Sequence, residues 1–92
     1  MDTEVTFEDA KGHIKVFDGV NRMGTLEFEL IDGTMVIQHT YTFKGYENKG
    51  VGMALMGAAV EAAKERGMKI NPLCSFAKVY FDRHRELESL KN

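Results

Sequence analysis

The chain of 92 residues is poor in several residue types, and each shortage excludes a class of protein. It has one cysteine, so no internal disulfide can form and the fold does not depend on oxidation. It has no basic excess: the formal net charge is −2, whereas binding a nucleic-acid backbone usually requires a basic surface. No apolar run approaches the roughly 18 residues of a membrane span, and no signal segment opens the chain. We therefore expect an intracellular, cytoplasmic protein without a nucleic-acid or membrane partner.

The composition that remains is typical of a small globular protein. Apolar residues make up 43% of the chain and charged residues 28%. Proline occurs once, and no internal repeat or Pro/Gly/Ser-rich linker divides the sequence. We therefore predict a single domain over residues 1–92.

The first half of the chain predicts antiparallel β-structure. Apolar and polar residues alternate in two segments, and a third segment is rich in β-branched and aromatic residues. The Asp32-Gly33 pair between the second and third segments is a strong signal for a tight hairpin. Residues 3–8 are either a further edge strand or a loose arm. The three predicted strands are residues 13–17, 25–31 and 34–43.

After this meander the hydrophobic period becomes helical. Apolar residues recur at three- and four-residue spacing over residues 52–66, and Gly67 is placed to end this helix. Residues 68–72 predict another strand, and Ser75 is placed to cap a second helix over residues 75–84. The order predicts an α+β fold in which a right-handed βαβ unit brings the last two strands parallel. Its C-terminal helix is followed by a short charged tail, which we also expect to be helical.

The Gly50-Val51-Gly52 sequence stands where the long strand gives way to the first helix. One interpretation is an anion site, because a helix amino end offers unpaired N–H groups and Lys49 adds a cation. The other is a turn whose glycines only allow close packing of the helix on the sheet. The sequence has neither a Walker loop nor a convincing dinucleotide fingerprint, since Gly57 comes one residue too late.

Cys74 and His39 are the side chains best suited to catalysis. Cys74 precedes the second helix, whose amino end favours a thiolate, although a lone cysteine is more often a small buried apolar residue. His39 lies on the long strand as a structural hydrogen-bonding residue or as a base. The predicted strands are parallel, so both residues could face one cleft. We predict no metal site, because the histidines and Cys74 lack the short paired spacing of zinc ligands.

These features together resemble the small, single-domain N-acetyltransferases of the GNAT superfamily. The resemblance rests on His39-Thr40, on Gly50-Val51-Gly52, and on Pro72-Leu73-Cys74 followed by an aromatic helix ending in Arg83-His84. It spans residues 13–90. It implies a minimal GNAT fold, namely a meander of three to four antiparallel strands, a right-handed βαβ unit and a C-terminal helix.

The resemblance also implies acetyl-coenzyme A as the cofactor. The superfamily signature, Gln/Arg-x-x-Gly-x-Gly/Ala, binds the cofactor's pyrophosphate with backbone amides, and its pantetheine arm lies between two splayed parallel strands. Glu47 replaces the Gln or Arg of the signature and places an anion beside an anionic cofactor. The implied cofactor-binding residues are Thr40, Tyr41, Thr42, Phe43, Asn48, Lys49, Gly50, Val51, Gly52, Met53, Asn71, Phe76, Tyr80 and Arg83.

The activity implied is acetyl transfer to an amine, either a small molecule or a protein. In a direct route, strand amides stabilise the oxyanion and His39 takes the proton of the amine. In a covalent route, the Cys74 thiolate accepts the acetyl group first. A chain of this length has no room for the helices that help full-size members to form an acceptor pocket. The alternative is therefore a coenzyme A-binding sensor or protein-interaction module without efficient chemistry.

Overall fold

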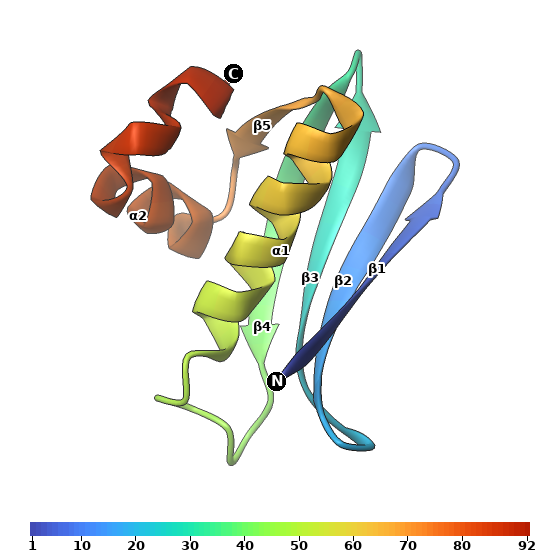
Figure 1. Ribbon diagram of the computed structural model, residues 1–92, viewed down its shortest axis with the longest axis vertical. Helices are drawn as coiled ribbons and strands as arrows, with labels where there is room; N and C mark the ends of the chain where they lie inside the picture. Colours follow the sequence, from blue (N-terminus) through green and yellow to red (C-terminus); the bar gives the residue numbers. More distant parts are fainter.

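A five-stranded sheet forms the centre of the computed structural model, which describes all residues from 1 to 92 (Figure 1). Its strands follow the chain order and are β1 (Asp2–Glu8), β2 (Lys11–Asp18), β3 (Asn21–Ile31), β4 (Thr34–Thr42) and β5 (Lys69–Pro72). The first four strands pair antiparallel, and β4 pairs parallel with β5. Three helical segments complete the fold: α1 (Val51–Arg66), α2 (Ser75–Arg83) and the 3₁₀ helix η1 (Arg85–Leu90). The predicted α+β meander and β4–α1–β5 unit are confirmed, and residues 2–8 form an edge strand.

The core lies between one face of the sheet and α1, which crosses that face in Figure 1. The alternating residues of the strands supply one side of it, and α1 supplies the other with its apolar stripe. The buried side chains include Ile14, Val16, Leu26, Phe28, Met35, Ile37, Leu55, Met56, Ala59, Ala63 and Ile70. No helix covers the other face of β1 to β4, which we call the open face.

A β-bulge interrupts the regular pairing of β3 with β4. Phe28 pairs with Ile37, but the preceding residue, Glu27, pairs with His39, so Gln38 is the additional residue in β4. An extra residue reverses which face the following side chains occupy. Thr40, which pairs with the buried Leu26, therefore lies on the helix side of the sheet.

The ends of the helices agree with most of their sequence signals. Gly50 precedes α1 with φ 81°, and Gly67 follows it with φ 65°, as predicted for a helix stop. The prediction that Ser75 caps α2 is wrong. Cys74 holds the cap position in an extended conformation and makes no side-chain capping hydrogen bond. Ser75 is instead the first helical residue, because the chain leaves β5 and turns one residue earlier. Neither α1 nor α2 is long and apolar enough to cross a membrane.

The chain end packs against β5. Lys91 forms an isolated parallel bridge with Ile70, and the Asn92 amide donates to the Ile70 carbonyl oxygen at 2.8 Å. The Asn92 side chain also donates to the hydroxyl of the buried Thr34 at 2.7 Å. The predicted charged tail thus takes the form of η1 plus a short strand-like contact at this edge of the sheet.

Candidate functional site

The two parallel strands separate part of the way along β4. Their pairing ends at Ile37 and Pro72, after which the amides of Leu73 and Cys74 both donate to the Ile37 carbonyl oxygen at 3.1 Å. β4 continues to Thr42 with β3 on one side and no strand on the other. Backbone donors and acceptors along this part of β4 are therefore available to a ligand.

The amino end of α1 lies beside this open part of β4. Gly50 makes no side-chain cap, and the first turn contains no acidic residue. The first helical hydrogen bond runs from the Ala54 amide to the Gly50 carbonyl oxygen at 3.0 Å. The amides of Val51, Gly52 and Met53 come before it and have no acceptor within the helix. Unpaired amides and the positive end of the helix dipole favour an anion here.

A cavity of about 250 Å³ joins these two features. Eight of the predicted cofactor-binding residues come together around it, and Tyr46 is the only lining residue that the sequence analysis missed. Its side chain lies in the loop between β4 and α1, where no periodic pattern marks an inward direction. The lining residues are Thr40, Thr42, Tyr46, Asn48, Gly50, Val51, Gly52, Met53 and Phe76.

The other six predicted cofactor-binding residues do not line this cavity. Tyr41 is 58% exposed and pairs with Thr25, which places it on the open face. Asn71 lines a different hollow, beside α2 and the chain end. Lys49 and Arg83 are exposed at the surface. The remaining two of the six are Phe43 and Tyr80.

The two glycines of the Gly-x-Gly sequence have different roles. Gly50 has a positive φ that other residues rarely adopt, and its side-chain direction is open. At Gly52, a Cβ atom would lie 2.5 Å from Cζ of Phe76, so this glycine lets α2 approach the start of α1. The packing interpretation therefore holds at Gly52. Gly50 shapes a turn that leaves the amides accessible, and the anion site stays a prediction.

Gly24 of β3 is a further residue that positions the site, and the sequence analysis missed it. A Cβ atom there would lie 2.6 Å from the Tyr41 carbonyl oxygen and 2.6 Å from Cγ1 of Val51. The absence of a side chain thus allows the first residue of α1 to pack against the sheet. A glycine within an alternating strand is a signal for such a close approach.

The Glu47 side chain is held within its own loop. Its Oε1 accepts a hydrogen bond from the Gly45 amide at 2.9 Å. This bond satisfies one carboxylate oxygen locally, and Glu47 does not line the cavity. The exposed Lys49 is the cation of this loop nearest in sequence to the amides.

Cys74 and His39 do not face one cleft, so that prediction is wrong. Cys74 Sγ lies 3.4 Å from the Thr40 hydroxyl, on the cavity side of β4. His39 is exposed and pairs with the exposed Glu27 on the open face. The bulge at Gln38 is the reason, because it reverses the facing of the residues that follow it.

Tyr80 stacks on His84 at the end of α2. The ring centroids are 4.1 Å apart, and His84 Nδ1 lies 2.8 Å from the Tyr80 carbonyl oxygen. Burial, and secondarily the Glu86 carboxylate, raise the pKa of the Tyr80 phenol above its usual value of 10.0. The phenol is therefore protonated near neutral pH and can donate a hydrogen bond.

Solved structures share this architecture. The ribosomal-protein-S18-alanine N-acetyltransferase of Escherichia coli aligns with a TM-score of 0.70 at 10% identity, over 84% of this chain and 53% of its own. The PaiA N-acetyltransferase of Thermoplasma acidophilum, solved with coenzyme A, aligns with a TM-score of 0.59 at 16% identity, over 80% and 48%. The chain thus spans about half the length of these two proteins, and the likeness shows the fold alone.

A protein of similar size also matches. The solution structure of a GCN5-like protein from Staphylococcus aureus aligns with a TM-score of 0.68 at 27% identity, over 97% of this chain and 87% of its own. No curated protein sequence matches significantly. The family model of GCN5-related N-acetyltransferases matches residues 13–90, the span over which the sequence resembles GNAT proteins. The strands β4 and β5 separate next to the unpaired amides of α1. Together with this geometry, the match shows that the chain belongs to the GCN5-related N-acetyltransferase family.

Proposed function

We propose that the protein transfers the acetyl group of acetyl-coenzyme A to an amine. The observation that carries this proposal is the continuity of two binding elements in one cavity. The free edge of β4 offers backbone groups to an extended, amide-containing arm, and the free amides of α1 offer donors to a pyrophosphate. A nucleotide thioester with these two parts in this order fits the arrangement.

The residues present are compatible with this cofactor. Gly50 puts no side chain in front of the α1 amides, and the Glu47 carboxylate is bonded within its own loop. Phe76 and Met53 supply apolar surface to the cavity wall. When bound, acetyl-coenzyme A supplies an activated acyl group; the protein orients it and stabilises developing charge with backbone donors.

A direct transfer uses the open face of the sheet for the acceptor. His39 is exposed on that face, one residue from Thr40, which lines the cavity on the other face. In this arrangement, an amine that approaches from the open face passes its proton to His39 or to a water bound there. The exposed His39 thus remains the base of this proposal, although it does not act together with Cys74.

A covalent route is the second candidate, because the Cys74 thiol adjoins the hydroxyl of the cavity residue Thr40. The Cys74 sulfur would form a bond to the acetyl carbon as the bond from that carbon to the sulfur of coenzyme A breaks. The Cys74 proton leaves to solvent, and the departing coenzyme A thiolate takes up another. The acceptor amine would then displace Cys74 and restore the thiol.

Coenzyme A is expected to raise the melting temperature of the protein. Saturation at 100 times the dissociation constant stabilises the folded state by about 2.7 kcal/mol. Gly50→Ala should weaken coenzyme A binding measured by calorimetry, because it strains the left-handed turn before the α1 amides. Gly33→Ala is the matched control: it has φ 77° in a distant hairpin and a similarly open environment.

Both variants should lose similar stability, about 1–2 kcal/mol from the left-handed conformation, but only Gly50→Ala should lose affinity. If millimolar coenzyme A neither shifts the melting temperature nor gives a binding heat, the proposal is wrong. If coenzyme A binds and a panel of amines yields no acetylated product, the cofactor-binding sensor or interaction module is the better description.

Cys74→Ala separates the two routes. The covalent route predicts that the wild-type protein gains the mass of one acetyl group after mixing with acetyl-coenzyme A. It also predicts that Cys74→Ala shows neither this mass increase nor amine acetylation. The direct route predicts that Cys74→Ala keeps turnover within a few-fold of the wild type. Thr40→Val is the comparison variant: it removes the hydroxyl contact to Sγ but leaves the thiol in place, so under the covalent route it should still gain the acetyl mass that Cys74→Ala lacks. Full turnover by Cys74→Ala would rule out the covalent route.

A further inference from the structure

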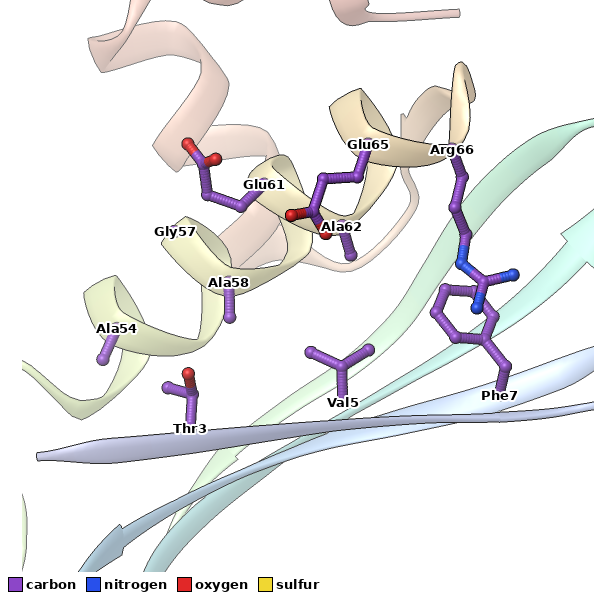
Figure 2. Close-up of a pocket in the computed structure, with 10 residues that line it drawn as sticks. All are labelled: Thr3, Val5, Phe7, Ala54, Gly57, Ala58, Glu61, Ala62, Glu65 and Arg66. Atoms are coloured by element: carbon purple, nitrogen blue, oxygen red, sulfur yellow. The ribbon is translucent and has the colours of Figure 1, made fainter.

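A second hollow of the protein lies away from the proposed transfer site. It is a groove of about 500 Å³ between β1 and the outer side of α1, shown in Figure 2. We call it the β1 groove. Its lining residues are Thr3, Val5, Phe7, Ala54, Gly57, Ala58, Glu61, Ala62, Glu65 and Arg66.

Small helix residues create this space. In Figure 2 the side chains of Ala54, Ala58 and Ala62 point from α1 toward β1, and their shortness leaves a gap above the strand. Val5 lies in this gap and is 36% exposed although it is on the helix side of the sheet. At one end, the Arg66 guanidinium lies 3.5 Å from the centre of the Phe7 ring and closes the groove.

The β1 groove adjoins a free sheet edge. β1 is the first strand in the order of the sheet, so its outer edge has no strand partner. The opposite edge differs, because Lys91 and Asn92 contact Ile70 of β5 there. An unpaired edge offers a row of backbone donors and acceptors to an added strand.

Charge around this edge is mixed, with more carboxylates than cations: the groove itself holds Glu61, Glu65 and Arg66. Glu61 and Glu65 line the groove on the helix side, and neither has an ion-pair partner within 4.0 Å. Asp2, Glu4 and Glu8 alternate with Thr3, Val5 and Phe7 along β1 and so lie on its other face. Of these three, Glu8 has an ion-pair partner within 4.0 Å, His13 at 3.9 Å, and Glu4 and Glu8 lie opposite Lys15 and Lys11 of β2 in the strand register.

This charge distribution selects among occupants. A second copy that paired antiparallel through β1 would bring the acidic residues of both strands together, and such like-charge pairs destabilise a sheet. A basic segment would instead meet Glu61 and Glu65 beside the groove. On the other face of β1 it would meet Asp2, since Glu4 and Glu8 already lie opposite lysines of β2. Lysine suits this position, because its aliphatic stem can cover the alanine floor while its ammonium group reaches Glu65, whose side chain turns toward the groove in Figure 2.

We propose that the β1 groove binds an extended cationic segment of a partner protein, which joins the sheet as a further strand beside β1. Backbone pairing to the edge supplies the affinity, and the carboxylates on either side supply the preference for basic residues. This interaction is independent of acetyl transfer, because its residues do not line the cavity between β4 and α1.

The probe is an amidated peptide of alternating lysine and valine that matches the seven residues of β1 in length. Titration into the ¹⁵N-labelled protein should shift the amide signals of Thr3 to Glu8 and of the outer side of α1. A peptide of identical sequence with alternate N-methylated residues keeps the charge but cannot pair with the strand edge. It should bind at least tenfold more weakly.

Glu65→Lys should weaken binding of the probe by about three- to tenfold, because it exchanges an exposed attraction for a repulsion. Asp82→Lys is the matched control, an equal charge change on an exposed residue of α2 away from the groove. Equal binding of both peptides would show nonspecific charge attraction and overturn the proposal. So would an absence of shifts at millimolar peptide, or a dimer in light scattering with β1 amides protected from exchange.

Discussion

Replacing Phe81 with alanine is expected to lower the free energy of unfolding by about 3–5 kcal/mol, the usual cost of truncating a buried phenylalanine. The Phe81 side chain is 1% exposed and belongs to the core beneath α2. Only one other residue of α2, Ala77, is buried, so the ring is the main anchor of this helix. Because domains of this size are stable by about 5–15 kcal/mol, the variant should unfold at much lower urea concentration.

Phe76→Ala is the matched control on the same helix. Its ring is 39% exposed and contacts Gly52 at the site. We expect a smaller loss of stability and a clear change in coenzyme A affinity, because the ring forms part of the cavity wall. Urea unfolding followed by circular dichroism measures the first effect, and calorimetry measures the second. Equal losses of stability for the two variants would contradict the assignment of Phe81 as the anchor.

Gly24→Ala is expected to impair the site strongly, although it adds only one methyl group. The new Cβ would meet the Tyr41 carbonyl oxygen and Val51 Cγ1, each at 2.6 Å. The carbonyl belongs to the neighbouring strand and cannot move cheaply, so α1 must shift at its first residue. Overpacking of this kind costs about 1–3 kcal/mol. The shift also displaces the amides that we propose to bind the pyrophosphate, so coenzyme A affinity should fall at least tenfold.

Gly57→Ala provides the comparison for this prediction. Gly57 lies within α1, and a Cβ atom there has nothing within 4 Å. Alanine at such a position should stabilise the helix by about 0.5–1 kcal/mol and leave coenzyme A binding unchanged. Thermal unfolding and calorimetry on both variants decide the matter. Full affinity in Gly24→Ala would mean that the strand tolerates the methyl group and that Val51 is not held by this contact.

Most of the fold could be predicted from local sequence patterns. Alternation over residues 25–31 and the Asp32-Gly33 pair determined strands and a hairpin, because a half-buried strand needs a period of two. The helical period and Gly67 likewise predicted α1 and its end. The Ser75 cap was wrong because several residues near a helix start can cap it. Which residue caps the helix depends on where the preceding strand ends.

The candidate site was predicted less evenly. Eight residues that the GNAT resemblance implied do line the cavity, most of them in the continuous stretch from Asn48 to Met53. A continuous loop keeps its neighbours together in any fold. Tyr41, Asn71 and Arg83 lie elsewhere, because their positions depend on the facing of β4, the length of β5 and the rotation of α2. None of these three properties is encoded by a local pattern.

The sequence by itself determined the order of strands and helices, the glycine turn before α1 and, through its resemblance, the family. Tertiary structure decided which side chains share the cavity. Regular alternation from the buried Ile37 would have placed His39 on the helix side, beside Cys74. Pairing with β3 inserts Gln38 as a bulge, so Thr40 meets Cys74 and His39 turns to the open face. A bulge depends on register between two strands, and register is set by the packing of the whole sheet.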